Sequence, residues 1–282
     1  MKWYSYVFLS FLAFFLTMGI AYAVGSRLVF IAVLFAFLIS WIAYIPAYIF
    51  QTEKFYDLTG SIKYLFLTWF IYVLSYELYG FNIGNLILAI LISIWTVRLG
   101  SFLFMRIHKD GEDKRFRTIK TSAAQFFLTW TLSGMWVSLC SICALTAIAN
   151  PFGVTLNLVT YIGIGLFLLG FGIEVIADKQ KTAFRSILEN KNKFITSGLW
   201  SKSRHPNYLG EIILWFAIAV ISFSSLSGTQ YIALISPVFT YLLLVYVSGV
   251  RMLEDRANKK WGNLTEYQDY KKNTPTLFFK IF

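Results

Sequence analysis

The sequence predicts an all-α integral membrane protein that crosses the bilayer about seven or eight times. Hydrophobic residues make up 57% of the 282 residues and charged residues only 14%, and the mean hydropathy is +0.63. A soluble protein of this composition would expose too much apolar surface to water. The apolar residues also form long runs, and a helix needs about 20 of them to cross the hydrocarbon core. We therefore expect a single membrane domain spanning residues 1–282.

Eight apolar stretches are long enough, or nearly so, to be membrane spans. The predicted spans are 4–23, 28–50, 64–80, 86–105, 126–149, 156–177, 208–222 and 232–250. The first also resembles a signal peptide, because Lys2 precedes an apolar run that ends in the small-x-small pattern Ala21-Tyr22-Ala23. Its apolar run is longer than a usual signal core, which favours a retained span.

Lysine and arginine alternate between successive connections, which predicts the orientation of the protein. All but two of the 25 basic residues fall at the N-terminus, in the even-numbered connections or in the tail, with Lys54 and Lys63 assigned to the second connection. The exceptions are Arg27 and Arg98. Both termini are therefore predicted to be cytoplasmic. The net charge of +11 is explained by membrane topology, so no nucleic-acid partner is expected.

Ionisable side chains inside apolar spans cost roughly 2.5 to 3.5 kcal/mol each on insertion, so they are functional hypotheses. The candidates are Glu77, Arg98, Glu174, Asp178 and Glu211. Glu174 and Asp178 are one helical turn apart, and Lys181 and Arg185 continue the same stripe. A stripe of acids followed by bases suits a nucleotide cofactor, with a ribose and phosphates. It equally suits a helix that leaves the membrane with solvated charges.

The densest polar cluster, residues 194–211, leads directly into an apolar helix. Pro206 suits the first helical position, which places Asn207 and Glu211 one turn apart on a common face. Arg204 and His205 then lie at the positive end of that helix, where free N–H groups can bind a phosphate. A polar helix start at the membrane interface is the alternative explanation.

The segment 203–211, SRHPNYLGE, resembles the signature of the membrane reductases related to steroid 5α-reductase and the sterol reductases. The bacterial relatives of unknown substrate, of the DUF1295 type, are the most similar. The resemblance extends from Trp95 to the C-terminus and, more loosely, over residues 55–61, FYDLTGS. Residues 1–80 are then N-terminal helices, and residues 95–282 form the part that binds the cofactor.

The resemblance implies NADPH as the cofactor, and neither of the two histidines supports a metal site. The residues that it would place around NADPH are Arg98, Asp178, Arg185, Asn207, Tyr208, Glu211, Glu254 and Tyr267. Arg204 and His205, predicted from the helix start to lie near a phosphate, complete the expected cofactor site. Asn207 and Glu211 correspond to the nicotinamide end, and Asp178 and Arg185 to the adenosine and phosphate end.

The proton-donating half of the site departs from the family pattern. The catalytic tyrosine of the steroid reductases corresponds here to Trp95, which cannot donate a proton in the same way. Glu53 and Asp57 are the nearest acids that could replace it, and Tyr208 is a third catalytic candidate. We therefore expect the cofactor half to be retained and the substrate half to differ.

The expected function is transfer of a hydride from NADPH to a C=C bond of a lipophilic steroid-, sterol- or isoprenoid-like substrate. Such enzymes use the protein for orientation and electrostatics. A methyltransferase using S-adenosylmethionine, like the isoprenylcysteine methyltransferases, is one alternative because these share the Arg-His-Pro start. A noncatalytic lipid-binding or scaffold protein is the other. Membrane lipids are expected partners, the oligomeric state is open, and a bacterial inner membrane is favoured over the endoplasmic reticulum.

Cys140 and Cys143 have C-x-x-C spacing but lie inside the fifth apolar span. With no second pair and no nearby histidine, two small packing residues are the better interpretation. Gly163, Gly165, Gly170 and Gly172 do not match the dinucleotide fingerprint and are expected to allow close helix packing.

Overall fold

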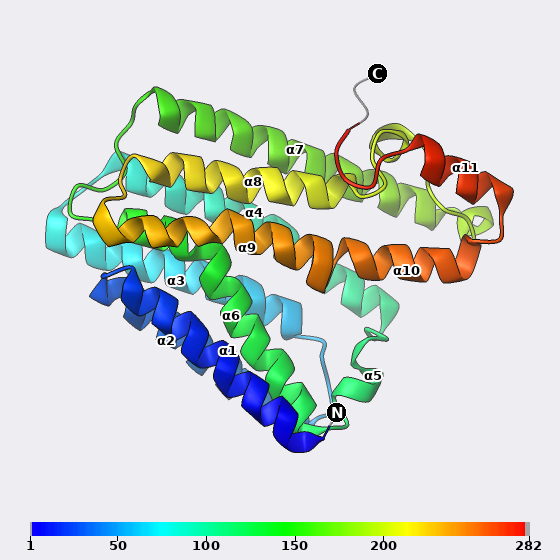
Figure 1. The fold of residues 1–282 in the computed structure, drawn as a ribbon, viewed down its shortest axis with the longest axis horizontal. Helices are drawn as coiled ribbons and strands as arrows, with labels where there is room; N and C mark the ends of the chain where they lie inside the picture. The colour runs from blue at the N-terminus through cyan, green and yellow to red at the C-terminus, as the bar shows by residue number, and fades with distance from the viewer. Residues whose placement is uncertain (1, 280–282) are drawn as a thin grey trace. The chain divides into compact units, whose positions relative to one another are not determined.

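A computed structural model describes residues 2–279, and every regular element in that range is a helix (Figure 1). The long and short α-helices are α1 (Trp3–Ala23), α2 (Arg27–Ile49), α3 (Tyr56–Tyr79), α4 (Ile83–Asp110), α5 (Phe116–Ile119), α6 (Ala123–Ile148), α7 (Leu158–Ser186), α8 (Pro206–Phe223), α9 (Ile235–Leu242), α10 (Val250–Trp261) and α11 (Thr265–Asn273). Short 3₁₀ helices cover Leu188–Asn190, Gly198–Ser201 and Gly228–Leu234, and a π-helix covers Leu243–Val247. The predicted all-α class is confirmed.

Eight helical stretches in the described residues are long and apolar enough to cross a membrane. They are α1, α2, α3, α4, α6, α7, α8 and the composite stretch Gly228–Trp261. The eight predicted spans are confirmed, and the chain is an integral multi-pass membrane protein. The bounds differ most at the last stretch, which continues to Trp261 instead of ending at residue 250. They also differ at α3, which begins at Tyr56 instead of residue 64, and at α7, which continues to Ser186 instead of ending at residue 177.

The assignment of Lys63 to a connecting loop is wrong, because Lys63 lies inside α3 and is fully buried. Its ammonium group donates to Ser40 Oγ and to Ser133 Oγ, each at 2.7 Å. No carboxylate pairs with it within residues 2–279. The two hydroxyls come from α2 and α6, so the partners that let a lysine enter the apolar interior are distant in sequence.

The contacts divide the chain into two compact units. The first contains residues 2–160 and 221–236, and the second contains residues 161–220 and 237–279. The first unit therefore holds α1 to α6, and the second holds most of α7, α8 and α9 together with α10 and α11. The single domain expected from the sequence stays a prediction.

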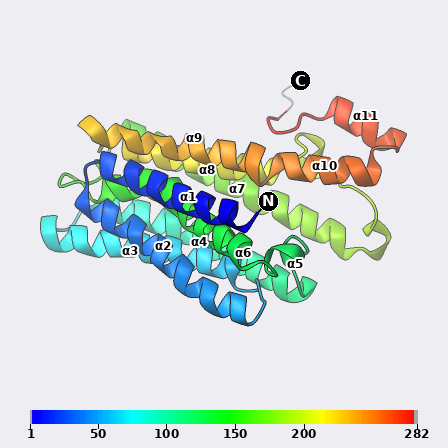
Figure 2. The same ribbon diagram turned by 60° about the horizontal axis from the view of Figure 1, so that its bottom comes forward.

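Helix α6 forms the centre of the first unit. It is the most buried of the candidate spans, and α1, α2 and α3 pack against it, as Figures 1 and 2 show for α1 and α2. Gly134 makes one of these contacts possible, since a Cβ atom there would lie only 2.9 Å from Cδ1 of Phe37. Cys140 and Cys143 are buried in the same helix as thiols, with no disulfide between them, and fill space between helices.

We expect Lys63→Met to raise the free energy of unfolding of the detergent-solubilised protein by about 1 to 3 kcal/mol. A methionine fills similar volume without burying a charge, and replacing buried charges by apolar groups is often stabilising. Lys63→Ala should instead lower stability by roughly 2 to 4 kcal/mol, because it leaves a cavity. Thermal or urea unfolding followed by tryptophan fluorescence measures both variants. Equal destabilisation by both would mean that the ammonium hydrogen bonds outweigh the cost of burial.

Candidate functional site

Two glycines bring the first turns of α8 against α7 in the second unit. A Cβ atom on Gly170 would lie 2.6 Å from the carbonyl oxygen of Gly210, and one on Gly210 would lie 2.6 Å from the backbone nitrogen of Glu174. The backbones therefore touch at this point, and the close packing predicted for Gly170 is confirmed. It is wrong for Gly165 and Gly172, where a Cβ atom would meet nothing within 4 Å. The contact places the buried carboxylates of Glu174 and Asp178 on the helix that faces the start of α8.

The segment that precedes α8 is fastened to α7 by three contacts. The amide of Leu199 donates to Gln180 Oε1 at 2.9 Å, and Trp200 Nε1 donates to the carbonyl of Ala177 at 3.1 Å. The ammonium group of Lys181 lies 4.7 Å from the centroid of the Trp200 ring, a distance at which a cation is attracted to the ring face. The polar segment 194–205 is thus an ordered wall beside α7.

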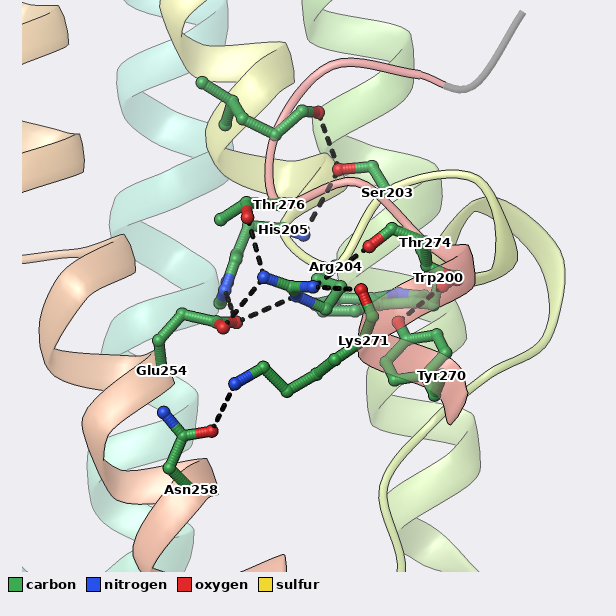
Figure 3. A network of polar contacts seen from close by, with 11 residues as sticks. Trp200, Ser203, Arg204, His205, Glu254, Asn258, Tyr270, Lys271, Thr274 and Thr276 are labelled. Carbon is green, nitrogen blue, oxygen red and sulfur yellow. Dashed lines mark hydrogen bonds and ion pairs between the residues drawn. The ribbon is translucent and has the colours of Figure 1, made fainter. Parts of the chain in front are cut away.

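Arg204 is the centre of a polar network at the start of α8 (Figure 3). Its Nε and Nη2 donate to the two carboxylate oxygens of Glu254 at 3.2 and 2.9 Å. Nη2 also donates to Thr276 Oγ1 at 2.6 Å, and Nη1 donates to the carbonyls of Lys271 and Thr274 at 2.9 and 3.0 Å. A guanidinium has five N–H donors, and all five are used within the protein. The geometry therefore gives Arg204 the role of a clamp and leaves it no donor for the phosphate expected from the sequence.

The C-terminal segment 274–279 is held across the start of α8 by this clamp and by two further bonds. Ser203 Oγ donates to the carbonyl of Leu277 at 2.6 Å, and the amide of Arg204 donates to the carbonyl of Pro275 at 2.9 Å. Leu277 is buried with Leu209 and Val250. The tail is therefore a structural part of the second unit.

His205 is oriented by the same carboxylate that holds Arg204. Its Nε2 lies 2.8 Å from Glu254 Oε1, and the side chain is buried. Burial lowers the pKa of the imidazole below its ordinary value of 6.5; Glu254 opposes this shift, and the cations Lys181 and Arg204 add to it. The neutral ring therefore donates from Nε2 and presents Nδ1 as an acceptor. Nδ1 is buried and has no hydrogen-bond partner in the described part of the chain.

Asn207 carries a second buried acceptor of this kind. Its Oδ1 has no hydrogen-bond partner within residues 2–279. Pro206 is the first residue of α8, as predicted, and Asn207 follows it in the first turn. Buried polar atoms in native proteins are nearly always paired, so two such acceptors in three consecutive residues are candidates for binding a ligand group that donates.

Ser248, a residue that no sequence pattern predicted, carries a third buried polar atom of this kind. Its buried Oγ has no hydrogen-bond partner among the described residues. Gly249, the next residue, packs against Tyr208, since a Cβ atom on Gly249 would lie 2.7 Å from Tyr208 Cε1. The signal that could have pointed to it is the Ser248-Gly249 pair at the end of the predicted span 232–250.

Tyr267 is buried in an aromatic cluster on α10, α11 and the segment before α8. Its ring centroid lies 5.0 Å from that of Phe194 and 6.0 Å from that of Trp261. Tyr270, in the same cluster, donates from its hydroxyl to the carbonyl of Trp200 at 2.6 Å. Burial raises the pKa of both tyrosine hydroxyls. A cavity of about 370 Å³ adjoins the cluster and is lined by Asn192, Lys193, Phe194, Thr196, Trp261, Leu264 and Glu266.

A family described as "Protein of unknown function (DUF1295)" matches residues 43–274 of the sequence. The chain belongs to the DUF1295 family. It is also similar to the uncharacterized protein C594.04c of Schizosaccharomyces pombe, with 23% identity over 230 residues, which cover 67% of this chain and 63% of that protein. The DUF1295 match includes α3, α4, α8 and the Arg204–Glu254 pair, so the family shares the region in which the site residues lie.

The DUF1295 chain carries the remaining predicted site residues in two groups. Asp178, Arg185, Glu211, Glu254 and Tyr267 belong to the second unit with the Arg204 network. Arg98, Glu53 and Asp57 belong to the first unit. The cofactor roles predicted for these residues stay predictions.

Glu53, a predicted catalytic residue, makes structural contacts in the DUF1295 chain. Its buried carboxylate accepts from the amide of Asp113 at 3.0 Å and from the ammonium group of Lys120 at 2.7 Å. Both carboxylate oxygens of Glu53 are therefore used within the protein. It ties the connection before α3 to the segment around α5.

Asp57 and Arg98, which also belong to the first unit, have other neighbours than Glu53. Asp57 Oδ2 lies 4.0 Å from Arg106 Nη2, and both side chains are partly exposed. The guanidinium of Arg98 lies 5.3 Å from the centroid of Phe102 on the same helix. Of the three catalytic candidates, only Tyr208 lies in the same helical turn as Asn207.

We expect Arg204→Lys to lower the free energy of unfolding of the DUF1295 protein by about 2 kcal/mol, because an ammonium group cannot replace five directed donors. The tail should loosen first. Hydrogen exchange of residues 274–279 should become faster, whereas the exposed-site control Arg117→Lys should leave it unchanged. Unchanged exchange in Arg204→Lys would show that the tail is held by Leu277 and its apolar neighbours alone.

We expect stability to fall as the pH drops below about 6.5, because the unfolded chain then binds a proton that the folded His205 resists. The contribution of His205 to the free energy of unfolding is complete above the pKa of this histidine in the unfolded chain. It is lost as the pH falls toward the lower pKa of His205 in the folded state. His205→Gln should flatten the dependence of the melting temperature on pH in this window. Replacing the exposed second histidine, His108→Gln, should keep the wild-type slope. A wild-type slope in His205→Gln would contradict the assignment.

Proposed function

We propose that this DUF1295 protein is a membrane-embedded reductase that uses NADPH to reduce a C=C bond of a lipophilic steroid-, sterol- or isoprenoid-like substrate. The observation that carries the proposal is the start of α8, where His205 Nδ1 and Asn207 Oδ1 are buried without partners among the described residues. The resemblance of residues 203–211 to the signature of the membrane reductases gives the ligand that these atoms would meet.

The chemistry of these atoms fits NADPH. Both are acceptors, so they require ligand groups that donate, and NADPH offers a carboxamide N–H₂ and ribose hydroxyls. Asp178 on α7 is an acid suited to a ribose hydroxyl. Lys181 and Arg185 follow on the same stripe of α7 and supply positive charge for the phosphates. The cofactor supplies the hydride.

The cavity beside the aromatic cluster fits a second part of the same cofactor. Its wall contains the flat side chains of Phe194 and Trp261 and the cation of Lys193. Aromatic and cationic side chains bind nucleobases by stacking and charge. This combination supports a site for the adenine end, separated from the polar start of α8.

The residues of the chain would have distinct tasks in the reaction. Glu254 fixes the orientation of His205 and Arg204. The tail, through Leu277 and its apolar neighbours, excludes water from the start of α8. Tyr208, one residue after Asn207, can donate a proton to an oxygen of the substrate. We also propose that the protein functions in a bacterial inner membrane, where the lipophilic substrate reaches it from the bilayer.

NADPH should raise the melting temperature of the detergent-purified protein, and NADH or S-adenosylmethionine should do so less or not at all. A ligand at about 100 times its Kd stabilises the folded state by about 2.7 kcal/mol. Asn207→Ala should reduce the NADPH shift while the fold is retained. Asn157→Ala is the matched control, because it removes the Asn157 Oδ1 acceptor of the Thr160 amide at the other end of α7 and should leave the shift unchanged.

A shift with S-adenosylmethionine and none with NADPH would replace the reductase by a methyltransferase. No shift with any of the three would favour a noncatalytic lipid-binding protein. An NADPH shift of equal size in Asn207→Ala would refute the site while keeping the cofactor.

A further inference from the structure

The last membrane span is interrupted where it passes the start of α8. Helix α9 ends at Leu242, the π-helix Leu243–Val247 follows, and α10 begins at Val250 (Figure 1). The amide of Ser248 donates to the carbonyl of Leu243 at 2.9 Å, which closes the wide turn. Such π-bulges occur frequently at functional sites. The interruption lies wholly within the second unit.

Gly249 lets the interrupted span approach the first turn of α8. A Cβ atom at this position would lie 2.0 Å from the carbonyl oxygen of Leu244 and 2.7 Å from Tyr208 Cε1. Only a residue without a side chain fits between them. The contact joins the segments that hold Asn207 and Ser248. Asn207 directly precedes Tyr208, and Ser248 directly precedes Gly249.

Ser248 differs from Ser40 and Ser141 in the hydrogen bond of its hydroxyl. A serine in a helix usually donates to the carbonyl one turn before it, as Ser40 does to Ala36 at 2.9 Å and Ser141 does to Val137 at 2.6 Å. Ser248 Oγ is buried and makes no such bond with any described residue. Its hydroxyl is therefore a donor that the protein itself does not use.

The surroundings of the interruption favour an uncharged ligand group. The cluster beside it consists of Leu209, Val250 and Leu277, with Tyr208, Ile212, Ile213, Tyr241, Val245 and Phe279 packed against it. The charges of the adjoining network, those of Arg204 and Glu254, pair with each other. These apolar walls disfavour a phosphate, whereas a carbonyl oxygen would accept from a serine hydroxyl at no cost in charge burial.

We infer that Ser248 donates to the carbonyl oxygen of the nicotinamide carboxamide, and that Asn207 Oδ1 accepts from the N–H₂ of the same group. The inference rests on the proposed function. A primary carboxamide is an uncharged group of NADPH that offers one acceptor and one donor side by side, which matches one hydroxyl donor and one amide acceptor. Ser248 is thus a further residue for binding the cofactor, supplied by the span that the sequence motif does not include.

The test compares binding of three probes to the full-length protein in detergent. They are NADP⁺, its thionicotinamide analogue, in which a poorly accepting sulfur replaces the carbonyl oxygen, and its 3-acetylpyridine analogue, in which a methyl group replaces the N–H₂. We expect Ser248→Ala to weaken NADP⁺ binding about 3- to 10-fold. The wild-type preference for NADP⁺ over the thio analogue should disappear in Ser248→Ala and persist in Asn207→Ala. The wild-type preference for NADP⁺ over the acetylpyridine analogue should instead disappear in Asn207→Ala and persist in Ser248→Ala.

Thermal unfolding without ligand separates this role from a structural one. Ser248→Ala removes a buried hydroxyl without a partner among residues 2–279, so it should leave the melting temperature unchanged or raise it. Ser138→Ala is the matched control, because Ser138 Oγ in α6 is also buried without a partner in the described residues. It should have a similar effect on stability and none on NADP⁺ binding.

Each outcome decides between the proposals. If the wild-type protein binds none of the three probes, the proposed function fails and this inference fails with it. If it binds NADP⁺ and Ser248→Ala binds all three probes as the wild type does, only the inference is overturned. Loss of binding together with a lower melting temperature in Ser248→Ala would assign Ser248 a structural role and also overturn it.

Discussion

In the hydrocarbon core of a bilayer no water is available to pair with polar groups, so the protein must pair them itself. This requirement explains why the described chain is helical, and it also governs the side chains inside the spans. Ser75 Oγ donates to the carbonyl of Ile148 at 2.7 Å, and Asn85 Oδ1 accepts from the amide of Val154 at 2.9 Å. Even Lys63 finds two hydroxyls. His205 Nδ1 and Asn207 Oδ1 are among the buried polar atoms for which the described residues supply no partner, and the proposed function pairs them with a ligand.

The spans could be predicted from the sequence because hydropathy and length are local properties. The errors arise where pairing is not local. Residues 56–63 contain Asp57 and Lys63, which resemble a polar connection in sequence, yet they belong to α3 because Ser40 and Ser133 on other helices accept from the lysine. A sequence pattern carries no information about which distant hydroxyl will lie beside a cation, so the start of α3 could not be found in this way.

In the candidate site, too, the features set by local sequence could be predicted and those set by distant contacts could not. Pro206 and the helix start after it follow from local rules, and α8 begins there as predicted. Arg204 was predicted to lie near a phosphate because it directly precedes the positive end of a helix. Its side-chain partners lie 50 to 72 residues further along the chain, and only the folded tail shows that its donors are already used. Ser248 was missed for a related reason, since a π-bulge depends on the packing of Gly249 against Tyr208.

The clamp has a consequence for the charge of the proposed site. Because Glu254 pairs with Arg204 and also accepts from a neutral His205, the start of α8 contains no excess charge in the described network. A neutral, water-poor environment suits the uncharged pyridine end of NADPH, where the hydride is held. The phosphates then require cations elsewhere, and the proposed function assigns this role to Lys181 and Arg185 of α7. Because Glu254 neutralises the charge of Arg204, the proposed site can bind the reactive end of the cofactor at α8 and its charged end at α7.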